Sequence, residues 1–382
     1  MEIFYLLCLI PLTVAVVAKI WFRHTISWLE FAAQGAIGIL FLAIVYFTGT
    51  YSAMADTEIH NGRVTQKVRE HDTYLESYSC NCRSRKVGNS TTTTCDTCYR
   101  RHYTVDWYLK STIGNISIDS ADWTSRAVYA LPNPSAYDQA VIGEHCAKTS
   151  SYSNYIKAAP DSIFHNVGVF DKKLMAMVPE YPYVRDIYKR NNVLTVGISR
   201  DQHIEALESS IDDSLKNLGK KKQVNINVVI ANTDNRLFRY ALEREWLGGK
   251  KNDVTVVIGA PEYPNIKWVQ AFTFANSADN NLLTTSIRNE LLNLQSTGHN
   301  LTSPQIVANM ITQLVDQQYR RKSMKDFEYL KDSIEPPTWV LVLSIVLSIL
   351  LGGGLTYYFH HNEIGSSSGR NTYRSNYNRF KP

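Results

Sequence analysis

The chain has 382 residues, which is enough for two modest domains besides any membrane-spanning segments. Its formal net charge is only +5, and its Lys and Arg residues are mixed with acids instead of forming a basic stripe, which argues against a nucleic-acid-binding surface. The mean hydropathy of −0.22 suggests a soluble protein, but this average conceals three concentrated apolar runs.

These three runs predict three transmembrane helices. The first covers about residues 3–22 and the second about residues 31–51, where Gln34 is the only strongly polar side chain. The third covers residues 338–359 and follows two consecutive prolines. Each run is close to the roughly 20 residues that cross about 30 Å of hydrocarbon. The sequence therefore predicts a multi-pass protein of the cell membrane.

The distribution of basic residues predicts the orientation of these helices. The short connector between the first two helices contains Lys19 and Arg23, with only Glu30 opposing them, and the C-terminal tail at 360–382 is also basic. The positive-inside rule places both segments in the cytoplasm. Three crossings then place the N-terminus and the large domain outside the cytoplasm. The tail has no set of apolar residues that could form a core, so we expect it to be disordered.

Four of the six cysteines form two close pairs, Cys80-x-Cys82 and Cys95-x-x-Cys98, on either side of a polar loop at 83–94. Four thiolates at this spacing can bind structural zinc tetrahedrally, as in a zinc ribbon. An oxidising compartment would instead favour two disulfides. The sequence leaves both alternatives open, and in both the cysteines are structural, because four thiolates leave zinc no open position for catalysis.

The segment at 53–188 around these cysteines is expected to form a β-rich region. Within it, residues 99 to about 185 are rich in Tyr, Thr, Ser and Trp and predict short strands and long loops. In the same β-rich region, Gly88-Asn89 is a turn signal and residues 103–109 are expected to form a strand. We find no motif in this region that points to catalysis.

The segment at 189–325 shows a different pattern, in which strand-like and helix-like stretches alternate. Asp201 is the expected start signal of the first helix and Gly219 its expected end signal. Alternating elements of this kind predict a three-layer α/β/α sandwich. The expected strands cover residues 193–198, 225–230, 253–258 and 266–274, and the expected helices cover residues 203–218, 235–246, 279–294 and 303–319.

At Trp246 the sequence reads Trp-Leu-Gly-Gly-Lys-Lys-Asn-Asp and continues directly into the apolar stretch at 254–258. With the order of elements, this segment makes residues 192–321 resemble the TPM domain family. The resemblance implies an extracytoplasmic α/β/α domain on a membrane anchor. It also implies a divalent-cation site, here for calcium, with Asp253 and Asp279 as the carboxylate ligands. The alternative roles for these residues are a strand-edge residue and a helix N-cap.

Residues 319–332 are charged at most positions and are expected to form a solvated helix, and the charged connector at 326–337 leads into the third transmembrane helix. With no convincing catalytic motif, the preferred function is non-enzymatic. The ectodomain would serve protein–protein interaction or the assembly of a membrane complex, with a protein partner or as a homo-oligomer through glycines of the transmembrane helices (Gly35, Gly38 and Gly352–Gly354). The alternative, which the family resemblance implies, is a metal-dependent phosphatase-like hydrolase.

Overall fold

In the computed structural model, the described residues are 2–87, 90–159, 171–276 and 278–362. The chain is a mixed α/β protein that divides into two compact units. The membrane unit comprises residues 1–56, 152–166 and 323–382, and the β-sheet unit comprises residues 57–151 and 167–322. The tail predicted to be disordered lies mostly outside the described residues.

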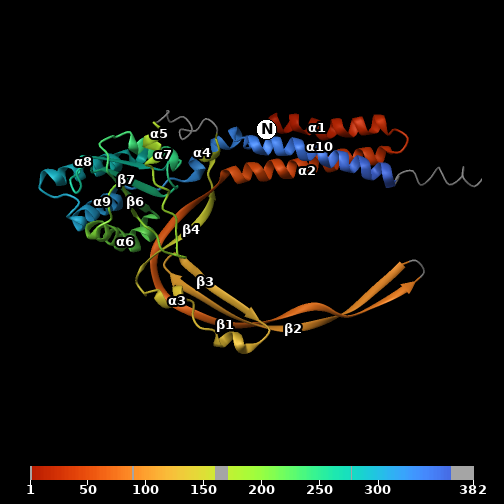
Figure 1. Ribbon diagram of the computed structural model, residues 1–382, viewed down its shortest axis with the longest axis horizontal. Helices are drawn as coiled ribbons and strands as arrows, with labels where there is room; N and C mark the ends of the chain where they lie inside the picture. Colours follow the sequence, from red (N-terminus) through yellow and green to blue (C-terminus); the bar gives the residue numbers. More distant parts are fainter. Residues whose placement is uncertain (1, 88–89, 160–170, 277, 363–382) are drawn as a thin grey trace, which may run out of the picture. The chain divides into compact units, whose positions relative to one another are not determined.

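The membrane unit contains the apolar helices α1 (Glu2–Trp21), α2 (Trp28–Met54) and α10 (Thr338–Asn362) (Figure 1). In the described part of the chain, these three helices are long and apolar enough to cross a membrane, which confirms the three predicted apolar helices. Ser27 and Glu30 form a capping box that fixes the start of α2, because each side chain accepts a hydrogen bond from the backbone of the other residue.

Glycines allow the three apolar helices to pack closely against one another. A Cβ atom added at Gly38 would lie 2.6 Å from Cβ of Pro11, and one added at Gly352 would lie 2.6 Å from Cγ1 of Val14. Gln34 joins α2 to α10, since its Nε2 donates a hydrogen bond of 3.0 Å to the carbonyl oxygen of Gly352. Two of the glycines expected to serve oligomerisation therefore serve packing within this chain.

The charged segment before α10 differs from its prediction. It forms a 3-10 helix, η4 (Met324–Ser333), instead of a solvated α-helix that starts near Tyr319. Tyr319 is buried and ends the preceding helix, and Ser323 caps η4 by accepting a hydrogen bond from the amide of Lys325. The membrane unit also contains the short helix α4 (Tyr155–Ala158).

The first sheet of the β-sheet unit has the strand order β3-β2-β1-β4. The strands are β1 (Ala55–Val87), β2 (Ser90–Ser111), β3 (Gly114–Trp123) and β4 (His145–Ser153). Within the segment at 99–185, β3 and β4 are short strands of 10 and 9 residues, as predicted, but β2 enters it as a strand of 22 residues. The longest strand, β1 with 33 residues, precedes this segment. The short helices η1 (Arg126–Ala130), α3 (Ser135–Gln139) and α5 (Lys172–Ala176) follow in the same unit.

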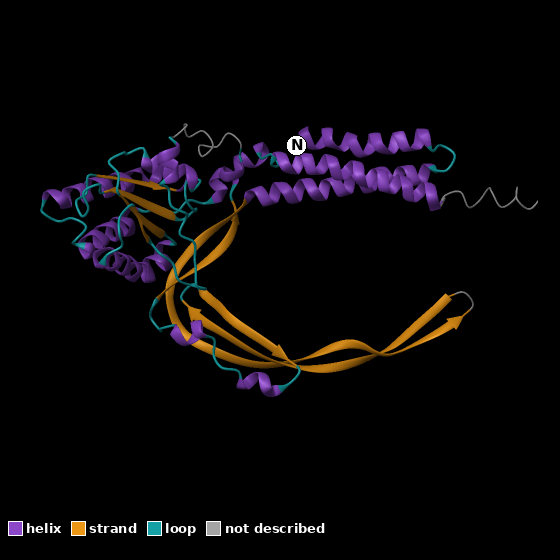
Figure 2. Ribbon diagram, in the orientation of Figure 1, coloured by secondary structure: helices purple, strands orange, loops and turns teal. Residues whose placement is uncertain are grey.

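The second sheet has the order β5-β6-β7-β8, with β8 antiparallel to three parallel strands. Every residue of β6 (Asn225–Ala231) and β7 (Asp253–Gly259) is buried, because helices cover both faces (Figure 2). On one face, Val228 and Val256 pack in a core with the helices α6 (Gln202–Lys222), α8 (Asn281–Ser296) and α9 (Pro304–Gln318). On the other face, Val229 and Val257 pack in a core with the helix α7 (Phe238–Glu245). The remaining elements are β5 (Val193–Val196), β8 (Trp268–Thr273), η2 (Phe274–Asn276) and η3 (Ala278–Asn280).

Helix α6 begins as predicted but ends later. Asp201 caps it, since its Oδ1 accepts two backbone hydrogen bonds of 3.0 Å. The helix continues through Gly219, and Gln223 takes the left-handed conformation expected of that glycine, with φ of 52°. A Cβ at Gly219 would lie 2.2 Å from the carbonyl oxygen of Asn61 in β1. Gly219 therefore permits a close approach between α6 and the first sheet.

Candidate functional site

Strands β1 and β2 continue beyond β3 as a two-stranded antiparallel arm, which we call the ribbon (residues 71–87 and 90–102) (Figure 1). The pairing of β2 with β3 stops at Tyr103, which lies opposite Trp123. Every residue at 71–86 is exposed except Cys80, and every residue at 91–101 is exposed except Cys98. At these described positions, the side chains of the ribbon thus pack on no hydrophobic core.

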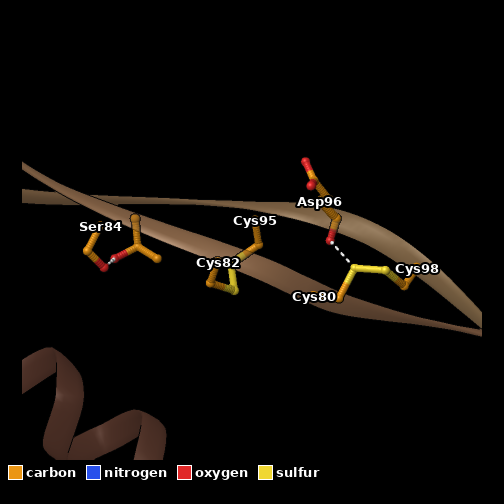
Figure 3. Close-up of a disulfide and its surroundings, with 7 residues drawn as sticks. Cys80, Cys82, Ser84, Cys95, Asp96 and Cys98 are labelled. Carbon is orange, nitrogen blue, oxygen red and sulfur yellow. Dashed lines mark hydrogen bonds between the residues drawn. A yellow bond between two sulfur atoms is a disulfide. The ribbon is translucent and has the colours of Figure 1, made fainter.

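The four paired cysteines form two disulfide bonds across the ribbon, Cys80 to Cys98 and Cys82 to Cys95 (Figure 3). The zinc-ribbon expectation is therefore not supported, and the alternative of two disulfides is the one observed. The predicted polar loop at 83–94 is also wrong, because Arg83 pairs with Thr94 and the ladder continues to Val87 opposite Ser90. The turn signal at Gly88–Asn89 lies outside the described residues.

A β-bulge explains the unequal spacing of the two cysteine pairs. Cys80 lies opposite Asp96 and Arg83 lies opposite Thr94, so two residues of β1 face one residue of β2 between these pairs. Asn81, one of the two, has φ of 48°, in the left-handed region that asparagine tolerates. The extra residue brings Cys82 to Cys95, with Cα atoms 4.0 Å apart.

The disulfides replace the core that the ribbon lacks. A two-stranded hairpin without a packed face is marginally stable in water. The bonds close loops with sequence separations of 18 and 13 residues. A loop of about 15 residues corresponds to roughly 3 kcal/mol of stabilisation in the chain-entropy description. The ribbon can therefore hold one shape while both of its faces remain accessible.

A polar cluster fixes the ribbon where β3 ends. Asp122 of β3 accepts a hydrogen bond of 2.6 Å from the Tyr74 hydroxyl and lies 2.7 Å from Nδ1 of His102. The His102 ring stacks on the Tyr74 ring, and its Nε2 lies 3.0 Å from Glu76. The hydrogen bond to Asp122, supported by Glu76, raises the pKa of His102.

The outer part of the ribbon combines exposed apolar surface with positive charge. Leu75 is 57% exposed and Tyr99 68% exposed, and the Arg100 guanidinium lies 4.8 Å from the centroid of the exposed Tyr78 ring. Between Glu76 and Arg101 there are five cationic side chains and two carboxylates, which gives a net charge of +3. The cations are Arg83, Arg85, Lys86, Arg100 and Arg101, and the acids are Glu76 and Asp96.

Asp253, one of the two predicted cation ligands, lies buried at the start of β7. Its Oδ1 accepts a hydrogen bond of 2.7 Å from Asn225, and its Oδ2 accepts bonds of 2.8 Å from the Tyr181 hydroxyl and the Lys250 amide. Burial raises the pKa of this carboxyl, and the charge of Arg190 opposes the increase. Both oxygens thus have protein donors, which fits the alternative role of a strand-edge residue.

Asp279, the other predicted ligand, lies in η3 and is exposed. Its carboxylate forms an ion pair with Lys322. Asn280, not Asp279, occupies the N-cap position of α8. The described residues contain no group of three or more His, Cys, Asp or Glu side chains arranged to hold a metal ion. The calcium site at Asp253 and Asp279 stays a prediction.

No protein-family model matches the chain, and no curated protein matches it. A structural similarity was found to the solution NMR structure of the N-terminal domain of the cg2496 protein from Corynebacterium glutamicum, with 16% sequence identity and a TM-score of 0.25. The match covers 37% of this chain and 87% of that domain. At this TM-score the similarity assigns neither a fold nor a function, and the resemblance to the TPM domain stays a prediction.

Proposed function

We propose that this protein is a non-enzymatic membrane anchor whose ectodomain binds a partner protein through the ribbon. The observation that carries the proposal is an arm of the sheet that is stapled by two disulfides, exposed on both faces and packed on no core. Exposed Tyr and Leu side chains beside arginines suit a protein interface, because aromatic residues and arginine contribute most to such interfaces.

We further propose that the β-sheet unit lies outside the cytoplasm. Disulfides form and persist in oxidising compartments. The basic connector between α1 and α2 supports the same orientation, because cytoplasmic connectors carry an excess of Lys and Arg. These two arguments are independent, since one concerns redox chemistry and the other membrane insertion.

We prefer binding without catalysis to the phosphatase-like alternative because Asp253, a predicted ligand of the catalytic metal, is held by hydrogen bonds within the protein. Both oxygens of its buried carboxylate accept hydrogen bonds from protein donors, as a structural side chain requires. We retain the resemblance to the TPM domain as a proposal about the second sheet and its helices, which would then serve as the scaffold that presents the ribbon.

The proposal is tested by photo-crosslinking in the cells that naturally produce the protein. A photoreactive amino acid replaces Leu75 or Tyr99 in the ribbon, or Tyr240 of α7 as the control. Tyr240 is also an exposed aromatic residue, with 41% exposure. We expect discrete adducts at the two ribbon positions, identified by mass spectrometry, and none of the same species at Tyr240.

A second arm of this experiment replaces Cys82 and Cys95 by serine. If the stapled shape of the ribbon is what the partner recognises, the adducts at Tyr99 weaken at least severalfold. Differently tagged copies in one cell distinguish a heterologous partner from a homo-oligomer. Equal adducts at Tyr99 and Tyr240, or none at either ribbon position, would refute the proposal.

A further inference from the structure

A polar cleft of about 320 Å³ lies within the β-sheet unit, outside the ribbon. Its lining comes from three places in the chain, namely the start of β4, the loop at 185–191 and the helix α6. All of the residues that line it are polar or charged. Its volume is at the small end of the range for small-molecule sites in proteins, which is about 300–1,000 Å³.

The floor of the cleft consists of side chains held firmly in place. Only 4% of Arg190 is exposed, and its Nη1 donates a hydrogen bond of 2.8 Å to Asn225 while its Nε donates one of 2.7 Å to the carbonyl oxygen of Pro182. The His145 side chain is 7% exposed, and its Nε2 lies 3.0 Å from Oδ1 of Asn61. The floor is therefore rigid and polar before any ligand binds.

Asp212 of α6 lies beside this floor, with Oδ1 3.5 Å from Nδ1 of His145. Burial raises the pKa of Asp212 to about 7 and lowers the pKa of His145 to about 4. Near neutral pH, His145 is therefore uncharged and Asp212 is only partly ionised. The floor offers hydrogen-bonding groups with little net negative charge.

The other carboxylates of the cleft already have partners. Glu144 accepts hydrogen bonds of 2.8 Å from the Tyr188 hydroxyl and from the Val141 amide. Glu208 forms an ion pair with Arg200, outside the cleft lining, and Asp213 forms one of 2.7 Å with Lys216. Glu208 and Asp213 are thus paired with cations, whereas the partners of Glu144 are neutral groups and Oε1 of Glu208 has no hydrogen-bond partner among the described residues.

Two cations at the rim, Arg185 and Lys189, have only neutral partners among the described residues. Arg185 donates a hydrogen bond of 2.6 Å to the amide oxygen of Asn191, and the Lys189 ammonium lies 6.0 Å from the Tyr188 ring centroid. Neither forms an ion pair with a carboxylate in the described part of the chain. The cleft therefore presents two exposed cations without a carboxylate in ion-pair contact, and both can still bind an anionic group.

The backbone holds these two cations together. Arg185 and Lys189 pair with each other through reciprocal backbone hydrogen bonds of 2.7 and 2.8 Å. The turn between them requires positive φ at Asp186 (46°) and at Ile187 (74°). A β-branched residue in this region is strained, at a cost of about 1–3 kcal/mol, and such strain concentrates at ligand-binding sites.

We propose that this cleft binds a small ligand through an oxyanion group, a phosphate or a carboxylate, held between Arg185 and Lys189, with the rest of the ligand over His145 and Asp212. The planar guanidinium of Arg185 suits two-point recognition of either oxyanion, and Lys189 adds a point charge. The proposal is independent of the partner-binding role of the ribbon.

The test uses the full-length protein in nanodiscs of zwitterionic lipid. Inorganic phosphate and acetate are titrated separately by calorimetry, with the ionic strength kept constant by sodium chloride. Arg185→Gln and Lys189→Gln should each weaken oxyanion binding about tenfold. Both residues are exposed, so we expect unchanged melting temperatures. Arg236→Gln, an exposed arginine outside the cleft, is the matched control and should bind like the wild type.

Tight binding of phosphate but not of acetate identifies a phosphate ligand, whereas the reverse result identifies a carboxylate ligand, and both results support the cleft. The proposal is wrong if neither probe binds at millimolar concentration. It is equally wrong if Arg185→Gln and Lys189→Gln bind the probe as well as Arg236→Gln does.

Discussion

At the scale of single residues, Glu58 of β1 is a buried carboxylate that joins distant parts of the β-sheet unit. It forms ion pairs of 2.5 Å with Arg321 and 3.5 Å with Lys251. Burial by itself would raise the pKa of Glu58, but hydrogen bonds from His60 and Arg321 and the charges of Arg321 and Lys251 outweigh this effect and lower the pKa to about 2.

Because of Glu58, we predict that the free energy of unfolding depends on pH in the acid range. Between about pH 4.5 and pH 2 the unfolded chain binds a proton at this carboxyl and the folded chain does not, so the free energy of unfolding falls as the pH falls through this range. The contribution lost is about 3 kcal/mol, at 1.36 kcal/mol per pKa unit. Thermal unfolding of the full-length protein in detergent, followed by tryptophan fluorescence from pH 7 to pH 2.5, measures it.

Glu58→Gln should lower stability at pH 7 by about 2–3 kcal/mol and reduce the loss at low pH. Glu76→Gln is the matched control, because the Glu76 side chain is 50% exposed and its ion pair is worth little. An unchanged acid dependence in Glu58→Gln would show that other carboxyls dominate the acid response.

At the scale of elements, the apolar helices depend on glycine at particular faces. Gly352 and Gly353 are neighbours in α10, but an added Cβ at Gly352 meets Val14 of α1 at 2.6 Å, whereas one at Gly353 meets no described atom within 4 Å. Gly352→Leu should therefore separate the helices and lower the melting temperature of the full-length protein by several degrees. Gly353→Leu should leave it nearly unchanged. Equal effects of the two substitutions would contradict this packing.

The ribbon depends on its disulfides for its resistance to proteolysis. It carries trypsin sites at Arg83, Arg85 and Lys86, all exposed, and two disulfides maintain its strand pairing. Reduction and alkylation should increase trypsin cleavage at these sites at least tenfold, because a hairpin without a core frays once the crosslinks are removed. The unfolding transition of the second sheet should remain, since its core includes no ribbon residue. Peptide mapping by mass spectrometry locates the cuts, and equal cleavage before and after reduction would refute the role of the disulfides.

At the scale of the whole molecule, the orientation in the membrane determines which surfaces can meet partners. If the β-sheet unit is extracytoplasmic, a membrane-impermeant maleimide added to intact cells should label Ser120→Cys in β3. It should not label His24→Cys in the connector between α1 and α2. Both residues are exposed, so accessibility alone does not distinguish them. Labelling of His24→Cys but not of Ser120→Cys would invert the proposed topology.

The sequence by itself determined the three apolar helices and the order of strands and helices in the second sheet. Both follow from local periodicity: runs of about 20 apolar residues for a bilayer, and alternating apolar strands and helices for a sheet covered on both faces. The Asp201 helix cap was also readable, because a cap concerns residues two or three positions apart.

Only the tertiary structure decided the features that depend on distant partners. The long register of β1 with β2 joins residues up to 47 positions apart, Val64 with Ser111, and a polar ribbon exposed on both faces has no hydrophobic alternation to reveal it. The pairing of Cys82 with Cys95 depends on a bulge at Asn81, which shifts the register of the two strands. The cleft arose where β4, a strained turn and α6 meet, and no local pattern brings His145, Arg185 and Asp212 together, because that proximity is a property of the packed chain.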